Sequence, residues 1–353
     1  MEARNVIVEA LSARLVDIQA ESPWRVLGVL AALTVLVVPG ALNLEVKPST
    51  EAILPGDDPA VESLDSLRAE FYGDTTHVVV QQDDVRNQEV LERLERVENR
   101  VEKLENVRSV TSPASMFSQD IPADRDELVE KDYRGTVSND FDTALVSVRA
   151  DTQANPSEID KLHSSLSRIV ETEMPSAEYS LTGYNMIDLA TFQVIINDFI
   201  RITGVSFGAV LLVLYGFFRD PVQMLFPVVP VVFALVWMLG LGGYLGADLT
   251  IISMVSAAMI MGLGIDFGIH VSKSYFGSSG GFQNLREGMR ELSRGLLGGS
   301  LTTGTGFLAL LAAQLTGMHA LGIFLFTGIM SAYIGAVVLL PTVIVLVEGI
   351  EPK

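Results

Sequence analysis

The stretch LTIISMVSAAMIMGLGIDFGIHV, residues 249–271, is long and apolar enough to cross a lipid bilayer, yet it contains an aspartate, Asp266. A transmembrane helix needs about 20 predominantly apolar residues, and this stretch satisfies that length. A charged side chain at the bilayer centre costs at least ~2.5 kcal/mol, so it is retained where a function or a partner offsets that cost. Asp266 is therefore the first candidate functional residue, provided that the surrounding sequence encodes a membrane-embedded fold.

Five further stretches share this length and apolar character. The six predicted spans cover residues 26–44, 199–218, 222–245, 249–271, 296–315 and 321–347. One such run by itself is equally typical of a helix buried in a soluble core. Six of them, with consistent charges in the loops between them, predict a membrane α-helical bundle of six transmembrane helices.

Charge is segregated along the chain. The whole chain has a formal net charge of −19, and residues 45–198 carry 32 acidic and 14 basic side chains, a net charge of −18. We therefore expect residues 45–198, between the first and second spans, to form a water-soluble domain. So acidic a domain favours a halophilic and archaeal source, and a surface that gathers cations is the alternative.

Basic residues orient the predicted spans, because loops rich in Lys and Arg stay in the cytoplasm. The basic residues that precede span one or lie in the second-to-third and fourth-to-fifth links are Arg4, Arg14, Arg25, Arg219, Lys273, Arg286, Arg290 and Arg294. The links at 246–248 and 316–320 contain no Lys or Arg. We expect a multi-pass plasma-membrane protein with residues 1–25 as a cytoplasmic amphipathic segment, a cytoplasmic amphipathic elbow at 282–295, a cytoplasmic tail at 348–353, and the acidic domain outside.

The acidic domain has a readable pattern of strands and helices. Strand-like runs occur at residues 75–82, 107–113, 143–151 and 177–183, and helical spacing occurs between the first and second and between the third and fourth. The order β-α-β-β-α-β predicts an α+β ferredoxin-like domain. His77 and His163 are isolated, so we expect no catalytic centre, no metal site and no cofactor in this domain. Nothing in the pattern indicates a nucleic-acid partner.

Polar residues near Asp266 extend the candidate site. His270 lies one helical turn away, and Gly262, Gly264 and Gly268 let neighbouring helices approach closely. At a similar predicted depth, the fifth span carries four hydroxyl residues that face the carboxylate or bond their own backbone: Ser300, Thr302, Thr303 and Thr305. Intramembrane aspartyl proteolysis is disfavoured, because it needs two carboxylates and no second deep Asp is present.

Several motifs together resemble the lipid-exporting branch of the resistance-nodulation-division (RND) superfamily, which includes mycobacterial MmpL and hopanoid exporters. GLGIDFGIH at 262–270 is similar to the signature of the fourth helix in that branch, and LREGMRELSRGLLGGSLTTGTGFLALL at 285–311 is similar to its elbow and fifth helix. STEAILPGDDPAVESLDSLRAEFYGD at 49–74 resembles the start of its porter domain. The resemblance implies a porter-like role for residues 45–198, and ion coupling at Asp266.

Two departures from the family pattern matter. Mycobacterial members usually have Tyr after the Asp, whereas this chain has Phe267. Family members usually fuse two six-helix halves, whereas this sequence contains one half, so we expect a homodimer, with a different half-transporter as the alternative partner.

The resemblance implies a secondary active transporter rather than an enzyme. We expect an ion-gradient-driven half-size transporter, with H⁺ slightly favoured over Na⁺, that moves membrane lipids or other hydrophobic molecules. The alternatives are a protein-translocation motor like SecD and SecF, which are also six-helix halves, and a sterol-sensor-like receptor that does not transport.

Overall fold

The structure is a computed structural model that describes residues 2–71, 75–117, 135–152, 155–277 and 280–350. The chain divides into two compact units. We call Met1–Pro55 together with Ile195–Lys353 the helical unit, and Gly56–Val194 the sheet domain. Each is described by itself.

Six helical stretches among the described residues are long and apolar enough to cross a membrane, as predicted. Five of them combine an α-helix with shorter turns: α2 (Pro23–Val37) with η1 (Val38–Asn43), η4 (Gln223–Leu225) with α9 (Val228–Tyr244), η5 (Ser253–Val255) with α10 (Ser256–Phe276), α11 (Phe282–Leu308) with η6 (Ala309–Ala312), and α12 (Thr316–Ile334) with η7 (Gly335–Leu339) and α13 (Leu340–Glu348). The sixth, α8 (Tyr184–Phe218), begins in the sheet domain and continues without a break through the second predicted span.

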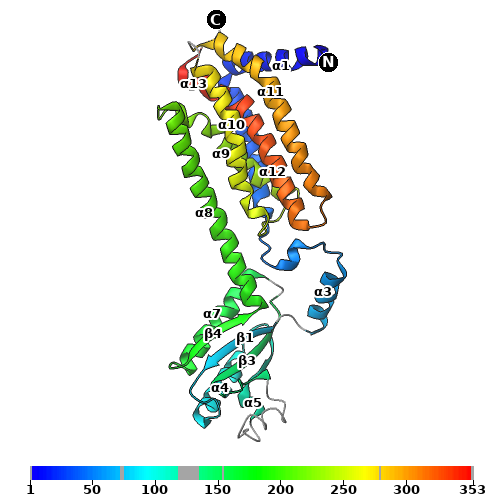
Figure 1. The fold of residues 1–353 in the computed structure, drawn as a ribbon, viewed down its shortest axis with the longest axis vertical. Coiled ribbons are helices and arrows are strands. Elements are labelled where there is room, and N and C mark those ends of the chain that lie inside the picture. The colour runs from blue at the N-terminus through cyan, green and yellow to red at the C-terminus, as the bar shows by residue number, and fades with distance from the viewer. Residues whose placement is uncertain (1, 72–74, 118–134, 153–154, 278–279, 351–353) are drawn as a thin grey trace. The chain divides into compact units, whose positions relative to one another are not determined.

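The centre of the helical unit is built from α9, α10 and α12 (Figure 1). About half or more of the residues in these three spans are buried, whereas fewer than a fifth are buried in the spans containing α2, α8 and α11. The uncovered side chains are largely apolar and include Leu212 and Val213 of α8. Such a surface suits contact with lipid or with another membrane helix rather than with water.

The fourth span begins later than hydropathy predicts. Leu249 is apolar but extended: its N–H donates to Glu45 O at 2.8 Å, and its carbonyl accepts from Lys47 N–H at 2.9 Å. The ammonium of Lys47 lies 2.7 Å from the carboxylate of Asp248. These bonds tie the chain that follows span one to the α9–α10 link, and the helix starts only at Ser253.

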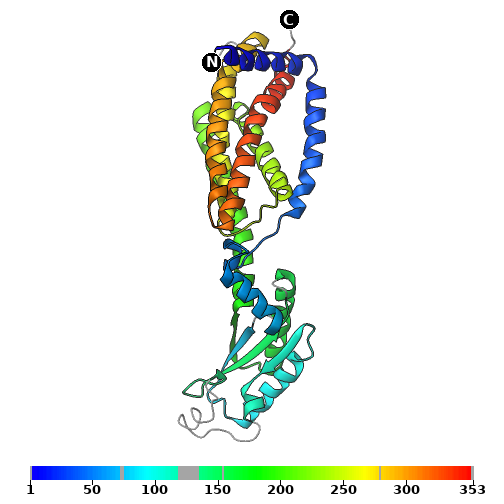
Figure 2. The ribbon, with the colours of Figure 1, turned by 90° about the vertical axis from the view of Figure 1, so that its right-hand side faces the viewer.

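The N-terminal helix α1 (Glu2–Glu21) lies across one end of the helical unit, roughly perpendicular to the spans (Figure 2). Val16 and Ala20 on its inner face are buried in the same core as residues of α11 and α13. This end of the unit also holds the start of α11 and the end of α13, and we call it the α1 end.

The sheet domain contains four antiparallel strands in the spatial order β2-β3-β1-β4. The elements along the chain are α3 (Pro59–Phe71), β1 (Thr75–Gln81), α4 (Gln88–Val101), β2 (Val107–Thr111), α5 (Pro113–Met116), β3 (Thr143–Ala150), α7 (Pro156–Glu173) and β4 (Glu178–Gly183). Alternate strand residues such as Val78 and Val146 pack against Leu94 of α4 and Leu166 of α7, so both helices cover one face. The predicted ferredoxin-like order is confirmed. Much of the Asp- and Pro-rich stretch after β2 lies outside the described residues.

Candidate functional site

One side of α10 packs tightly against its neighbours through glycines. A Cβ atom at Gly264 would lie 3.1 Å from the Cβ of Ala332 in α12. A Cβ atom at Gly268 would lie 2.5 Å from the carbonyl oxygen of Pro227, closer than van der Waals contact allows. Position 268 therefore needs glycine so that α10 can approach the neighbouring helix at this distance, whereas a side chain at 264 would require Ala332 to shift slightly.

Asp266 lies on the opposite, uncovered side of α10. Its side chain is exposed, and so are the His270 side chain one turn away and Gly262 one turn before. A Cβ atom at Gly262 would have no other atom within 4 Å. Within the described part of the chain, Asp266 forms no hydrogen bond or ion pair. Among the residues that the structure describes, a single copy therefore offers this carboxylate no hydrogen-bond or ion-pair partner.

Apolar residues surround Asp266 along the same face. Met259 and Leu263 are exposed on α10, and Leu301 is exposed on the adjacent α11. At the α1 end of α10, the Lys273 ammonium lies 5.5 Å from the centroid of the Phe217 ring in α8. The uncovered face is thus an apolar band that contains one carboxylate and one imidazole, with a cation at its end.

The predicted hydroxyl residues of α11 bond mainly to their own helix. Ser300 is buried and donates to Leu297 O at 3.0 Å, Thr302 donates to Gly298 O at 2.8 Å, and Thr305 donates to Leu301 O at 2.8 Å. Thr303 is half-buried. In the described residues, none of these hydroxyls bonds to Asp266. Backbone bonding of this kind is common for Ser and Thr in membrane helices and explains three of the four hydroxyls without a ligand.

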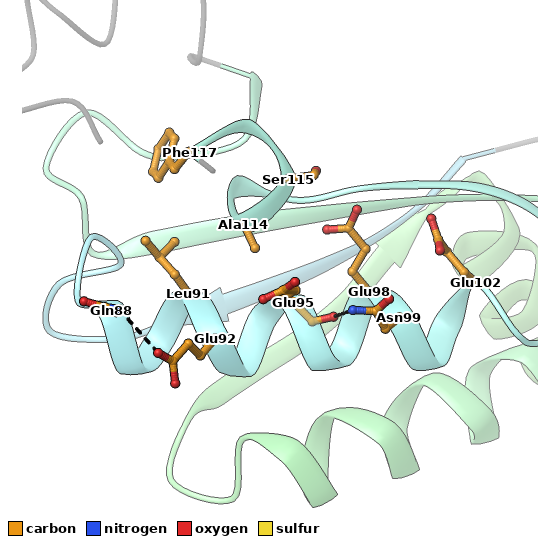
Figure 3. Close-up of a pocket in the computed structure, with 10 residues that line it drawn as sticks. All are labelled: Gln88, Leu91, Glu92, Glu95, Glu98, Asn99, Glu102, Ala114, Ser115 and Phe117. Carbon is orange, nitrogen blue, oxygen red and sulfur yellow. Dashed lines mark hydrogen bonds between the residues drawn. The ribbon is translucent and has the colours of Figure 1, made fainter. Parts of the chain in front are cut away.

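The sheet domain contains an acidic pocket that the sequence analysis missed. It lies between α4 and the segment after β2 and has a volume of about 400 Å³ (Figure 3). Its lining comprises Gln88, Leu91, Glu92, Glu95, Glu98, Asn99, Glu102, Ala114, Ser115 and Phe117. The helical spacing of Glu95, Glu98 and Glu102 along one face of α4 is the signal that could have revealed it.

Glu98 is the least exposed carboxylate in this pocket. Partial burial raises its pKa above the ordinary value, although Ser112 and Ser115 donate hydrogen bonds that favour the charged form. Among the described residues, no group of three His, Asp or Glu side chains has an arrangement that would hold a metal ion. The pocket is therefore an acidic cleft lined by four glutamates, of which Glu98 is the most buried.

Comparison with known proteins agrees with this architecture. The sequence profile of the MMPL family matches residues 52–350. A curated membrane protein of the archaeon Methanocaldococcus jannaschii is 25% identical over 379 residues, which cover 97% of this chain and 95% of that protein. The profile match includes the sheet domain and the five later spans. The chain therefore belongs to the MMPL family, a branch of the RND superfamily, and is a multi-pass membrane protein.

Proposed function

We propose that this protein is an ion-driven transporter of lipids or other hydrophobic molecules, and that Asp266 binds the coupling ion at an interface between two copies of the chain. Membership of the MMPL family supports an RND-type transporter. The observation that carries the finer proposal is the uncovered face of α10, where Asp266 and His270 are exposed and form no hydrogen bond or ion pair with the residues that the structure describes.

The physical reason for a second copy is the environment of Asp266. A charged Asp that faces lipid at the centre of a transmembrane helix costs about 3 kcal/mol. A helix pressed against the open face would remove this cost by shielding the carboxylate. The same face carries Gly262, where nothing within 4 Å would obstruct an approaching helix.

Two-fold symmetry makes a second copy the natural occupant. In a two-fold dimer the same patch is used on both subunits, so α10 of one subunit can pack against α10 of the other. This arrangement brings Asp266 and His270 of each copy towards those of its partner. A different half-transporter with a similar helix is the competing occupant, and the two are distinguished by the composition of the purified complex.

The coupling ion that we favour is H⁺. A proton needs only one carboxylate, whereas Na⁺ requires several oxygen ligands arranged around it. Three of the four hydroxyls of α11 donate to their own helix, and none forms a hydrogen bond to Asp266 in the described residues. His270, one turn from Asp266, suits a proton relay because imidazole gains and loses a proton near neutral pH.

We infer the orientation from charge. The α1 end carries Arg14, Arg25, Arg286 and Arg290, so we assign it to the cytoplasm and the sheet domain to the outside. An acidic sheet domain outside the membrane would then act on molecules after they leave the bilayer. The family match supports this reading over the protein-translocation motor and over the receptor.

The test uses a hydrophobic carbodiimide, which modifies protonated carboxyl groups in apolar surroundings and so reports the protonation of Asp266 directly. Purified protein in lipid nanodiscs is labelled across a range of pH, with and without Na⁺, and Asp266 is quantified by peptide mass spectrometry. We expect labelling that falls as pH rises and that Na⁺ does not suppress. Suppression by Na⁺ at constant pH would reverse the choice of ion.

Asp266→Asn provides the functional counterpart, because Asn keeps the volume but cannot change its charge. In proteoliposomes that contain a total lipid extract, the variant should show no protein-dependent H⁺ flux while it elutes at the same position as the unmodified protein on size exclusion. Flux at the rate of the unmodified protein would overturn the assignment of Asp266.

A further inference from the structure

The last span is interrupted near the α1 end. Its α-helix ends at Ile334, the turn Gly335–Leu339 is a π-helix, and a second α-helix begins at Leu340 with Pro341 in its first turn. Turns of π-helix are rare and occur frequently at functional sites. Pro341 has no N–H, so the carbonyl of Val337 lacks the donor that an uninterrupted α-helix would supply.

A side chain of α1 supplies donors to this turn. Gln19 is fully buried, and its Nε2 donates to Val337 O and to Val338 O, both at 3.1 Å. Because both partners are carbonyl oxygens, which only accept, the amide nitrogen of Gln19 must be the atom that faces them. Thr342 Oγ1 also donates to Val338 O, at 2.7 Å.

Gln19 is held in this position by these two bonds. Its Oε1 is buried and has no hydrogen-bond partner among the described residues. A buried amide oxygen without a partner carries an energetic penalty, which is tolerable where the nitrogen satisfies two carbonyls at once. The arrangement indicates that Gln19 is present for its donors, since Leu would fill a similar volume without leaving an acceptor unpaired.

The same helix is bonded to α11. The hydroxyls of Ser12 and Ser293 lie 3.0 Å apart, and Arg286 Nε donates to Asp17 Oδ1 at 2.8 Å. Since α1 contacts both α11 and the π-helical turn, it joins two later spans that lie far from it in the sequence. A displacement of α1 would therefore change the hydrogen bonding of the interrupted turn.

The interrupted turn lies close to the contact between α12 and α10. Ala332, three residues before the turn, is the residue that packs against Gly264. Gly328 lies one helical turn before Ala332 and packs against Ile260. A Cβ atom at Gly328 would lie 2.5 Å from the Ile260 side chain. Any change of angle at η7 moves α12 against α10, on the side of α10 opposite Asp266.

We propose that Gln19 is a positioning residue that holds a π-helical hinge in the last span, and that α1 thereby sets how α12 packs against the helix that carries Asp266. The hinge is independent of what the protein transports. Its consequence for Asp266 rests on the function proposed above.

The decisive experiment is a double-mutant cycle on the full chain in nanodiscs, read by amide hydrogen exchange of peptides that cover residues 335–348. Gln19→Leu removes both donors, and we expect exchange about tenfold faster, the size expected when one or two buried hydrogen bonds are lost. Pro341→Ala restores an N–H near Val337, so exchange in the Gln19→Leu/Pro341→Ala variant should return to within about twofold of the unmodified protein. Ile18→Ala, on the exposed side of α1, is the matched control and should change nothing.

The outcomes separate the hinge from the ion site. Unchanged exchange in Gln19→Leu, or no rescue by Pro341→Ala, overturns the proposal. If Gln19→Leu does not fold, the double variant decides, because it must fold if the missing donor is the whole defect. Carbodiimide labelling of Asp266 is then measured in the same variants. We expect Gln19→Leu to displace its pH profile and Ile18→Ala to leave it in place. An Asp266 that never titrates defeats the proposed function, whereas the exchange data still decide whether Gln19 holds the hinge.

Discussion

Replacing two glycines of α10 by alanine should have effects of opposite sign. Gly262→Ala adds a methyl group on the uncovered face, where no other atom lies within 4 Å. Gly268→Ala adds the same methyl group 2.5 Å from the carbonyl oxygen of Pro227. Both variants have the same substitution in the same helix. The difference between their stabilities therefore reports the packing on the two sides of α10.

The magnitudes follow from two terms. Alanine in place of glycine inside a helix gains up to about 1 kcal/mol, and this gain applies to both variants. At position 268 the atom in the way belongs to the backbone, so the start of α9 must move, and such overpacking costs about 1–3 kcal/mol. We therefore expect Gly262→Ala to be neutral or stabilising by up to ~1 kcal/mol, and Gly268→Ala to be destabilising by up to ~2 kcal/mol.

The assay is the temperature at which half of the single-copy fraction is lost from its size-exclusion peak after heating in detergent. A change of 1 kcal/mol corresponds to about 2–4 °C in a unit of 150–250 residues, the size class of the helical unit. An overpacking cost of about 1–3 kcal/mol should therefore separate the two variants by roughly 5 °C. Native mass spectrometry confirms that the fraction contains one copy. Equal midpoints for the two variants would refute the assignment of a packed and an uncovered side to α10.

Three further outcomes are expected. Gly262→Leu should lower the fraction of dimers in native mass spectra of protein in mild detergent, whereas Gly208→Leu, at an equally open position on α8, should not; equal fractions would contradict a dimer through α10. Thr302→Val should change the carbodiimide reactivity of Asp266 by less than about twofold, because its hydroxyl is bonded to Gly298 O and a proton needs no hydroxyl ligand; a larger change would favour Na⁺. Glu98 has a raised pKa in the folded state, so its contribution to stability is complete below the unfolded-state pKa and is lost as pH rises through the folded-state value. Glu98→Gln should thus raise the urea midpoint of the sheet domain more at pH 7 than at pH 4.5, measured by pulsed hydrogen exchange, and a larger gain at pH 4.5 would contradict burial as the cause.

Hydropathy and periodicity were sufficient to predict the six apolar spans and the β-α-β-β-α-β order of the sheet domain, but not α3 or α5. The predicted strand at 75–82 is β1 (Thr75–Gln81), and the helix expected between the third and fourth strands is α7 (Pro156–Glu173). Both follow from local signals, namely alternation in β1 and proline after an asparagine cap in α7. Local signals failed at Leu249, where backbone pairing with Glu45 and Lys47 overrides an apolar side chain that by itself favours a helix.

The arrangement of the candidate site could be predicted only in part. Helical spacing indicates that Asp266 and His270 share a face, but it does not distinguish a face that packs from one that is uncovered. Helical spacing also does not distinguish Gly262 from Gly268 as packing positions, although only a Cβ atom at Gly268 would meet a backbone carbonyl. The bond from Gln19 to Val337 joins positions 318 residues apart, and no pattern within either segment encodes it.

The uncovered face of α10 also bears on how the protein is made. A newly inserted copy would present a carboxylate to the acyl chains until it meets a partner, and neutralisation or displacement towards the headgroups are the two ways to relieve that exposure. Assembly would then complete membrane insertion rather than follow it. Membrane quality control would recognise surplus copies by one polar residue exposed to the acyl chains, and would degrade them. Asp266→Leu removes that residue. Cells that express this variant should therefore accumulate unassembled chains, whereas cells that express the unmodified sequence should degrade them.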